Sequence, residues 1–421
     1  MNLSIKIEKL FGNFNYELSF DKQVSILTSP NGFGKKTILK MLHFLYVKNF
    51  NRLLEIDFSI FEVKYGDNLF HVSKNNDGLL ITCNGTLVLD FKIQEFINHA
   101  AKLSYVKNNQ TGKWTIEHYL HLDIQAPIIP EVQIINRIYF TNSELTSIWN
   151  KLPKTLLIRA DRLIDYDDVS VQQIYHNQQN MQDINLTVNR YSHELRNLIS
   201  NTFNNYFTES QRLDSTFMQA FMQEIINFNE DTLDEDNYKK LIQSIEEKNL
   251  LLLKYGISQA IQESTPQYDE KHKAVFTIYI KHRTKKLSKF DDLLTRCELF
   301  TKIINEKRLV NKNIVINMQN GITAQRSDGR NLALQLLSNG EQNQLILLYE
   351  LLFRTQNINL VLIDEPEVGL HVSWQLEFLN DLKKILEIST MSSIIVTHSP
   401  QIINNEWEEV IDLSKQHENQ Q

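Results

Sequence analysis

Three polar side chains stand directly after two short apolar runs, and their types suit phosphate chemistry. Asp364 and Glu365 follow the run at 360–363, and His398 comes just after the run at 394–396. Unbroken runs of this length, rich in β-branched residues, are typical of strands buried on both faces of a parallel sheet. The carboxyl ends of such strands share one edge, where ligands bind in open α/β sheets. Two carboxylates and an imidazole at that edge can hold a metal–nucleotide and activate a water molecule.

A loop suited to phosphate lies near the other end of the chain. The apolar run at 24–28 predicts a buried strand, and Ser-Pro-Asn-Gly-Phe-Gly-Lys-Lys-Thr follows it at 29–37. A helical pattern comes next, with apolar residues at 38, 41, 42 and 45. Strand, glycine-containing loop with lysine, and helix are the context of a P-loop, whose backbone N–H groups attract phosphate oxygens. We expect the nucleotide-binding residues of this loop to be Asn31, Gly32, Phe33, Gly34, Lys35, Lys36 and Thr37.

The loop departs from the pattern G-x-x-x-x-G-K-[ST] at two positions. Ser29 replaces the first glycine, and Lys36 stands where the pattern has the hydroxyl residue that ligates Mg²⁺. Thr37 carries a hydroxyl one residue later. Two hypotheses therefore remain open from the motifs: a hydrolytic enzyme, and a nucleotide-binding scaffold that scarcely hydrolyses because Lys36 disables the metal chemistry.

The same residues also have structural interpretations. The acidic pair fits an ordinary polar strand end, and His398 fits a capping residue. Ser338 and Glu341 have the spacing of a capping box, which explains both residues without any ligand. The two readings are compatible there, because a capped helix start with Gly340 allowing close approach is also an anion site.

Composition excludes several other classes of protein. The chain has 421 residues, 42% of them hydrophobic, and a net charge of −7, so its surface as a whole does not favour nucleic acid. Cys83 and Cys297 lie far apart without a C-x-x-C partner, which argues against a disulfide framework or structural zinc. No apolar run reaches 18 residues, and the first residues begin a strand pattern instead of a signal peptide. We expect a soluble cytoplasmic protein without a membrane partner.

The remaining patterns predict strands at both ends and helices in the middle. Runs at 3–7 and 14–20 alternate apolar and polar residues, and turn dipeptides break further short runs at 66–67, 77–78 and 84–85. Residues 155–158 form another apolar run, and the polar tail from Ser414 is expected to be loose. Between 168 and 310 glycine and proline nearly vanish while apolar residues recur at helical spacing.

These motifs together resemble a known family. In chain order, residues 29–37, 337–342, 360–365 and 397–398 resemble the Walker A loop, signature motif, Walker B strand and switch histidine of ABC-type ATPases. Asp-Glu-Pro-Glu-Val-Gly-Leu-His at 364–371 and Thr-His-Ser-Pro at 397–400 are similar to the SMC-, RecF- and OLD-like AAA ATPases. Residues 157–163 and 212–217 resemble ATPase subunits of bacterial anti-phage systems, among them Septu (PtuA) and PARIS (AriA).

The resemblance implies an α/β fold, a P-loop ABC-type ATPase head with a mixed sheet and an antiparallel β-subdomain. Residues 1–167 and 311–421 would form the two halves of the head. Residues 168–310 would form an inserted helical or coiled-coil arm. A basic run at 281–289 within it either contacts DNA phosphates or forms a solvated helix face.

The family's roles, carried to the matching positions, define an ATP and Mg²⁺ site. Lys35 and the loop amides would hold the phosphates, while Asp364 and Thr37 would ligate Mg²⁺. Glu365 would be the catalytic group that polarises the attacking water, and His398 would contact the γ-phosphate. Asp161 stands near the position of the family's Q-loop residue and would sense the metal through water; the alternative is a surface ion pair with Arg162.

The resemblance also implies partners. Ser338, Gly340 and Glu341 would complete a second protomer's site, giving a head-to-head homodimer with two sandwiched ATP molecules. OLD-type relatives carry a nuclease after the head, whereas 23 residues follow His398 here. We therefore expect a sensor and scaffold of an anti-phage system that controls a separate nuclease or toxin. The alternatives are the scarcely hydrolysing scaffold and a RecF- or SMC-like DNA-repair ATPase.

Overall fold

The computed structural model describes residues 2–103, 105–107, 114–116, 131–140, 143–163, 186–226, 233–257, 267–307 and 309–418. These residues form two compact units. The first unit combines the N-terminal part up to Arg162 with the C-terminal part from Arg354, and the second comprises the described residues of 163–353. Residues 311–353, which we expected in the head, thus cluster with the helices that precede them.

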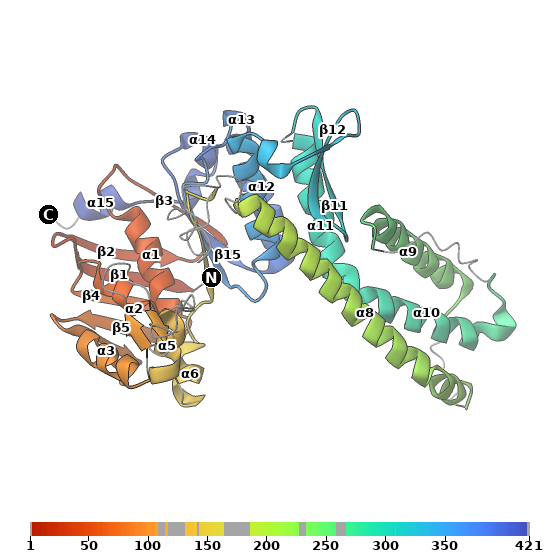
Figure 1. Ribbon diagram of the computed structural model, residues 1–421, viewed down its shortest axis with the longest axis horizontal. Helices are drawn as coiled ribbons and strands as arrows, with labels where there is room; N and C mark the ends of the chain where they lie inside the picture. The colour runs from red at the N-terminus through yellow and green to blue at the C-terminus, as the bar shows by residue number, and fades with distance from the viewer. Residues whose placement is uncertain are drawn as a thin grey trace. The chain divides into compact units, whose positions relative to one another are not determined.

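A five-stranded sheet at the centre of the first unit has only parallel neighbours, in the order β10-β14-β15-β3-β16. Its strands are β3 (Val24–Thr28), β10 (Thr155–Ile158), β14 (Leu360–Asp364), β15 (Ser392–Val396) and β16 (Val410–Asp412). Every residue of β14 is buried, as its unbroken apolar run predicts. Helix α1 (Lys35–Tyr46), labelled in Figure 1, packs against β10, β14 and β15. Together with the P-loop between β3 and α1, this sheet confirms the predicted α/β P-loop ATPase fold.

The second sheet of this unit is antiparallel throughout, in the order β2-β1-β4-β5-β6-β7. Its strands are β1 (Leu3–Leu10), β2 (Phe14–Phe20), β4 (Ile60–Tyr65), β5 (Asn68–Lys74), β6 (Gly78–Cys83) and β7 (Thr86–Lys92). The alternating residues of β2 are alternately buried and exposed, as a sheet with one covered face requires. Two-residue turns join β4 to β5 and β6 to β7. Gly66, Asn84 and Gly85 take the positive φ angles that such turns need.

Short helices complete the first unit. They are α2 (Phe50–Leu54), α3 (Ile93–Lys102), α5 (Glu131–Tyr139), α6 (Ser143–Trp149), α13 (Val372–Ser389), α14 (Pro400–Ile403) and α15 (Leu413–Glu418), with a small ladder of β8 (Tyr105–Lys107) and β9 (Trp114–Ile116). Residues 419–421 of the tail that was expected to be loose from Ser414 lie outside the described residues. The expectation was wrong for 414–418, because α15 forms there. Its first residue, Leu413, is fully buried, and packing of one apolar residue outweighs the polar composition.

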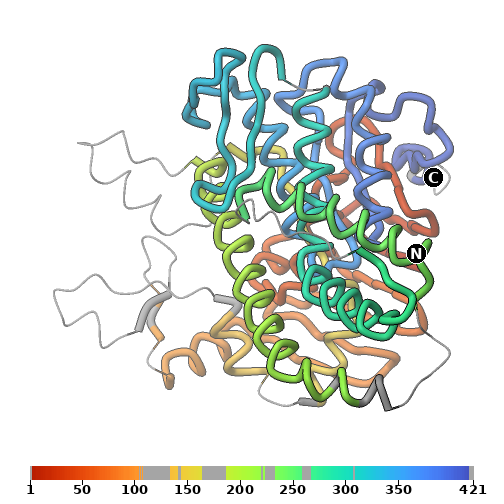
Figure 2. Tube along the Cα trace, turned by 90° about the vertical axis from the view of Figure 1, so that its right-hand side faces the viewer, coloured from red at the N-terminus to blue at the C-terminus, as the bar shows by residue number. Residues whose placement is uncertain are grey.

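The second unit is mostly helical. It contains α8 (Thr187–Ile226), α9 (Glu235–Lys254), α10 (Lys273–Leu287), α11 (Asp291–Lys307) and α12 (Asn339–Phe353), with strands β11 (Lys312–Asn317), β12 (Gly321–Arg326) and β13 (Asn331–Leu332). The long helix α8 runs beside α10, which also contacts α9 (Figures 1 and 2). Helix α12 packs against α8 and α11, and the rings of Tyr191 and Tyr349 stack with centroids 4.4 Å apart. These helices follow the 3.6-residue spacing of apolar residues in the sequence.

None of the helices in the described part of the chain combines the length and the apolar character needed to cross a bilayer. Cys83 and Cys297 are both buried, and neither forms a disulfide. Burial raises the pKa of the Cys297 thiol to about 12, so this side chain stays protonated at neutral pH.

Candidate functional site

The strand order brings the predicted chemistry to one edge of the parallel sheet. Strand β15 lies between β14 and β3, with Asp364 in register with Val396 and Val396 in register with Leu27. The phosphate loop, the acidic pair and His398 each follow one of these three strands. Because the strands are parallel, all three groups emerge at the same edge.

Two glycines shape the phosphate loop. Gly32 and Gly34 have φ angles of +93° and +82°, which L-residues with side chains rarely adopt. Gly34 also lacks room, since a Cβ built on it would lie 2.8 Å from Leu10 Cδ2. Gly34 is the residue before α1, and its carbonyl accepts the first hydrogen bond of that helix, from Ile38. The glycines therefore let the loop close tightly onto β1 and lead straight into the helix N-terminus.

Lys35 is held inside this loop. Its ammonium donates to the Ser29 carbonyl at 2.7 Å, to Ser29 Oγ at 3.1 Å and to the Pro30 carbonyl at 2.9 Å. These bonds use the three donors of an ammonium group. They also account for Ser29, whose hydroxyl contacts the lysine where the usual pattern has glycine. Burial lowers the pKa of Lys35, and the negative charge of Glu365 opposes that change.

The antiparallel sheet supports the loop through a residue that sequence reasoning missed. The Tyr16 hydroxyl, from β2, donates to the Phe33 carbonyl at 2.8 Å, and burial raises the pKa of Tyr16 to about 12. The rings of Phe14 and Phe33 are also in contact, with centroids 5.4 Å apart. The alternating pattern of β2 predicts that Tyr16 is buried, but it does not predict which loop the hydroxyl contacts, so no signal in the sequence indicated this role.

The acidic pair lies against Lys36, the second residue of α1. The Lys36 ammonium is 2.9 Å from Glu365 Oε2 and 3.8 Å from Asp364 Oδ2. Burial raises the pKa of Asp364, and the charge of Lys36 acts against that rise. Burial acts to lower the pKa of Lys36, but the hydrogen bond to Glu365 and the charge of Asp364 outweigh it and raise the pKa. Lys36 is therefore a charged ammonium at neutral pH, paired with both carboxylates.

The backbone of Glu365 is held in an unusual conformation. Its φ angle is +44°, and its N–H donates to the Val396 carbonyl at 2.8 Å. The buried Arg162 donates from Nη2 to the Glu365 carbonyl at 3.0 Å and from Nε to the Arg159 carbonyl at 2.7 Å. Asp161 itself is exposed. At the end of β10 the residue in contact with Glu365 is thus Arg162, which the sequence analysis considered only as a surface partner of Asp161.

His398 and Glu365 face each other across the end of β15. The His398 Nε2 atom lies 3.8 Å from Glu365 Oε1. The His398 backbone N–H donates to Glu367 Oε1 at 2.8 Å, so Glu367 fixes the start of the loop that carries the imidazole. Sequence reasoning quoted Glu367 within the motif but gave it no role. Ser399 is anchored in turn by its hydroxyl, which donates to Gln375 Oε1 at 2.6 Å.

Comparison with known proteins classifies the chain. A family model described as "AAA ATPase domain" matches residues 4–403. The chain belongs to this AAA ATPase family. It is an ATPase, as the motifs predicted. No curated protein matches the sequence.

Solved structures of Smc head domains resemble this AAA ATPase weakly. One, derived from Pyrococcus furiosus, has an extended coiled coil and is bound to the C-terminal domain of ScpA; it is 11% identical, with 98% of this chain and 93% of that chain covered and a TM-score of 0.40. A SmcHead bound to the C-winged helix domain of ScpA is 10% identical, with 98% and 94% covered and a TM-score of 0.42. The Thermotoga maritima SMC head domain is 8% identical, with 98% and 94% covered and a TM-score of 0.37. With TM-scores below 0.5, these likenesses add nothing to the family assignment.

ATPases of the AAA family generally use Mg²⁺ with ATP, and the residues here match that need only in part. Asp364 Oδ1 is buried and has no hydrogen-bond partner among the described residues, which suits a cation ligand. At the hydroxyl position, however, Lys36 offers only donors and a positive charge, already paired with the carboxylates. Thr37, the other predicted ligand, is half-buried one residue along α1. The residues present therefore do not fit a magnesium site of the usual composition.

The segment at 337–342 of the AAA ATPase lies in the second unit and forms the predicted capping box. The Ser338 N–H donates to Glu341 Oε2 at 2.8 Å, and the Glu341 N–H donates to Ser338 Oγ at 3.3 Å. Lys312 donates to both carboxylate oxygens of Glu341, at 2.9 and 2.8 Å. Burial acts to raise the pKa of Glu341, but the bonds from Lys312 and Ser338 outweigh it, so the pKa is lowered. Gly340 stands in the first turn of α12, between these two residues.

The basic run at 281–289 is partly neutralised within the second unit. Lys286 lies 2.6 Å from Asp214 Oδ1 on α8. The charges of Lys289 and Lys285 contribute to lowering the pKa of Glu209, after the larger effect of its hydrogen bond with Arg212. Lys281, Lys285 and Lys289 are exposed. The run is therefore in part a structural face of α10, while these three lysines face solvent.

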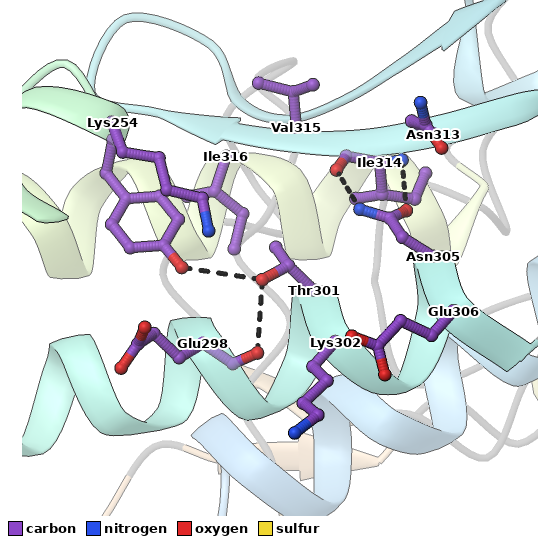
Figure 3. Close-up of a pocket in the computed structure, with 11 residues that line it drawn as sticks. Lys254, Glu298, Thr301, Lys302, Asn305, Glu306, Asn313, Ile314, Val315 and Ile316 are labelled. Carbon is purple, nitrogen blue, oxygen red and sulfur yellow. Dashed lines mark hydrogen bonds between the residues drawn. The ribbon is translucent and has the colours of Figure 1, made fainter.

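A hollow of about 650 Å³ in the second unit lies among the end of α9, helix α11 and strand β11 (Figure 3). Three of its polar side chains, those of Tyr255, Thr301 and Asn305, are hydrogen-bonded within the unit. Tyr255 and Thr301 have hydroxyl oxygens 3.4 Å apart, and Asn305 binds both the N–H and the carbonyl of Ile314, at 2.7 and 2.9 Å. Asn305 thereby covers the backbone edge of β11 to which a peptide strand would otherwise add. These contacts join the helix to the strand.

Proposed function

We propose that this AAA ATPase is the sensor and scaffold of a cytoplasmic anti-phage complex and controls a separate nuclease or toxin through ATP-dependent dimerisation. The observation that carries its chemistry is the common edge shared by the phosphate loop, the acidic pair and His398. Lys35 and the loop amides bind the phosphates of ATP. Glu365 polarises the attacking water. His398, whose Nε2 lies 3.8 Å from Glu365 Oε1, contacts the γ-phosphate.

The capping box at the start of α12 supports the dimer. The N-terminus of a helix attracts anions, and Gly340 leaves the backbone there open to close approach. The Glu341 carboxylate accepts hydrogen bonds from Lys312 and from the Ser338 N–H, and these bonds fix its position. Ser338, Gly340 and Glu341 of one protomer then meet the γ-phosphate of ATP bound to a second copy. ATP joins the two copies, and its hydrolysis or release separates them.

The role in defence is supported by the resemblance of residues 157–163 and 212–217 to ATPase subunits of anti-phage systems. The first of these segments contains the end of β10 and Arg162, which contacts Glu365. The second lies on α8, far along the chain from the ATP site. A helical unit of this kind suits a surface that binds an effector and changes its position with the nucleotide state.

Glu365→Gln tests the chemistry. This variant keeps the size of the side chain and removes the carboxylate that polarises water, so we expect ATP turnover to fall by about 100-fold or more while ATP still binds. Glu387→Gln, at an exposed position of α13, is the matched control and should turn over like the wild type. Sedimentation with ATP should then show a lasting dimer for Glu365→Gln. Equal turnover in all three proteins, or a monomer with ATP bound, would contradict the proposal.

A phage challenge tests the biological role. Cells carrying this gene with its neighbouring genes should give fewer plaques than cells carrying Glu365→Gln in the same genes. The Glu387→Gln cells provide the control. Equal plaque numbers in all cells, across a panel of phages, would argue against a defence function while leaving the ATPase chemistry intact.

Two other functions each have an observation in their favour. The pairing of Lys36 with both carboxylates favours a scaffold that binds ATP and scarcely hydrolyses it. In that case turnover is at background in both wild type and Glu365→Gln. The exposed Lys281, Lys285 and Lys289 favour a RecF- or SMC-like DNA-repair ATPase. DNA binding that weakens with salt, and weakens further when these lysines become glutamine, would support it.

A further inference from the structure

Lys36 occupies the position at which the usual P-loop pattern has the hydroxyl residue that ligates Mg²⁺. It follows Lys35 directly, so its side chain starts in the first turn of α1 beside the phosphate loop. Its ammonium lies 2.9 Å from Glu365 and 3.8 Å from Asp364, and its side chain keeps 42% of its surface exposed. The ammonium is therefore paired with the acidic residues, and the side chain that carries it is partly exposed.

In a P-loop site the divalent cation has two tasks in binding. It neutralises phosphate oxygens, and it separates them from the carboxylates at the end of the neighbouring strand. An ammonium on a four-carbon stem can do both, because it carries a positive charge and three donors that turn freely. One donor can stay on Glu365 at 2.9 Å, while Asp364 attracts the ammonium through its charge at 3.8 Å and another donor meets a phosphate oxygen.

We propose that the Lys36 ammonium, bridging the acidic pair and the phosphates, replaces the divalent cation in nucleotide binding, so that ATP binds to this chain without Mg²⁺. The inference rests on the proposed binding of ATP at the loop of residues 29–37. It concerns binding alone. A nucleotide held in this way stays bound when free Mg²⁺ falls.

Calorimetric titration with ATP, in excess MgCl₂ and in EDTA, tests the inference on the full chain. For the wild type we expect dissociation constants within about threefold of each other in the two conditions. Lys36→Ser restores the hydroxyl of the usual pattern and removes the charge; its affinity in EDTA should fall by about tenfold or more and recover with Mg²⁺. Lys384→Ser, at an exposed position of α13, is the control and should behave like the wild type.

Each result decides between the two ideas. Wild-type binding that is lost in EDTA and restored by Mg²⁺ overturns the role of Lys36 and leaves ATP binding in place. Metal-free binding that survives in Lys36→Ser also overturns it, because another group then supplies the charge. No ATP binding by folded wild type in either condition removes the proposed function itself. If Lys36→Ser does not fold, Lys36→Met keeps the stem without the charge, and it too should lose metal-free binding.

Discussion

Replacing Arg162 with methionine tests whether a buried guanidinium positions the Glu365 carboxylate. Arg162 is 5% exposed and donates to the carbonyls of Glu365 and Arg159. Hydrogen bonds from charged groups contribute about 1.5–3 kcal/mol each in mutational series. Methionine keeps the apolar stem and leaves no unpaired charge, and the Glu365 carbonyl retains its bond from the Val368 N–H at 3.1 Å. Two such bonds are lost, so we expect the free energy of unfolding to fall by about 3 kcal/mol, the lower end of the range for two bonds.

The same substitution should reduce catalysis more than binding. The left-handed backbone of Glu365, with φ of +44°, costs of the order of 1 kcal/mol or more and persists only while its surroundings hold it. Without Arg162 this residue can relax, and a loss of about 1.4 kcal/mol in the transition state lowers turnover about tenfold. The phosphate loop is untouched, so ATP affinity should change by less than about threefold.

Urea unfolding, steady-state ATP turnover and ATP titration measure these three effects. Arg159→Met is the matched control, since Arg159 is exposed and the substitution keeps the backbone carbonyl to which Arg162 donates. Both free energy and turnover should stay near the wild-type values in the control. If Arg162→Met unfolds like Arg159→Met, the contribution assigned to the guanidinium is wrong. If it loses stability but keeps full turnover, Arg162 stabilises the fold and does not position Glu365.

Two further substitutions test the loop and the capping box. Gly34→Ala adds a Cβ 2.8 Å from Leu10 Cδ2 at a φ of +82°, whereas Gly329→Ala meets a similar φ of +80° in open space. The backbone strain should lower the free energy of unfolding of both variants by about 1 kcal/mol. Gly34→Ala should lose more than this, because of the contact with Leu10, and should bind ATP less well. Glu341→Gln removes the charge paired with Lys312, so unfolding should cost about 1 kcal/mol less at neutral pH. Because the pKa of Glu341 is lowered in the folded state, its stabilisation is present above its unfolded pKa and is lost as pH falls through the lowered value. The difference between wild type and Glu341→Gln in urea should therefore shrink towards zero below about pH 4; a constant difference down to acid pH, or equal losses in the two glycine variants, would contradict these assignments.

The sequence alone determined which segments take part in the site. Each apolar run that became β3, β10 or β14 is bounded by polar residues that cannot continue a buried strand, so the strand ends could be read directly. Gly34 and Lys35 predicted a tight turn and a positive charge that can bind phosphate, and Ser338 with Glu341 predicted the start of a helix. These are local properties, set by backbone conformation and by residues within a few positions of each other.

Only the tertiary structure decided what the side chains meet. The contacts of Lys36 with Glu365, of Tyr16 with Phe33 and of Arg162 with the Glu365 carbonyl each join segments that are distant in sequence. They exist because β15 lies between β14 and β3 and because the antiparallel sheet brings β2 against the loop. Strand order and register arise from packing of the whole core, which no short pattern encodes. The residues that could bind a nucleotide could thus be predicted individually from the sequence. The pairing of Lys36 with the acidic pair became visible only in the folded chain, and the proposed binding of ATP without Mg²⁺ depends on it.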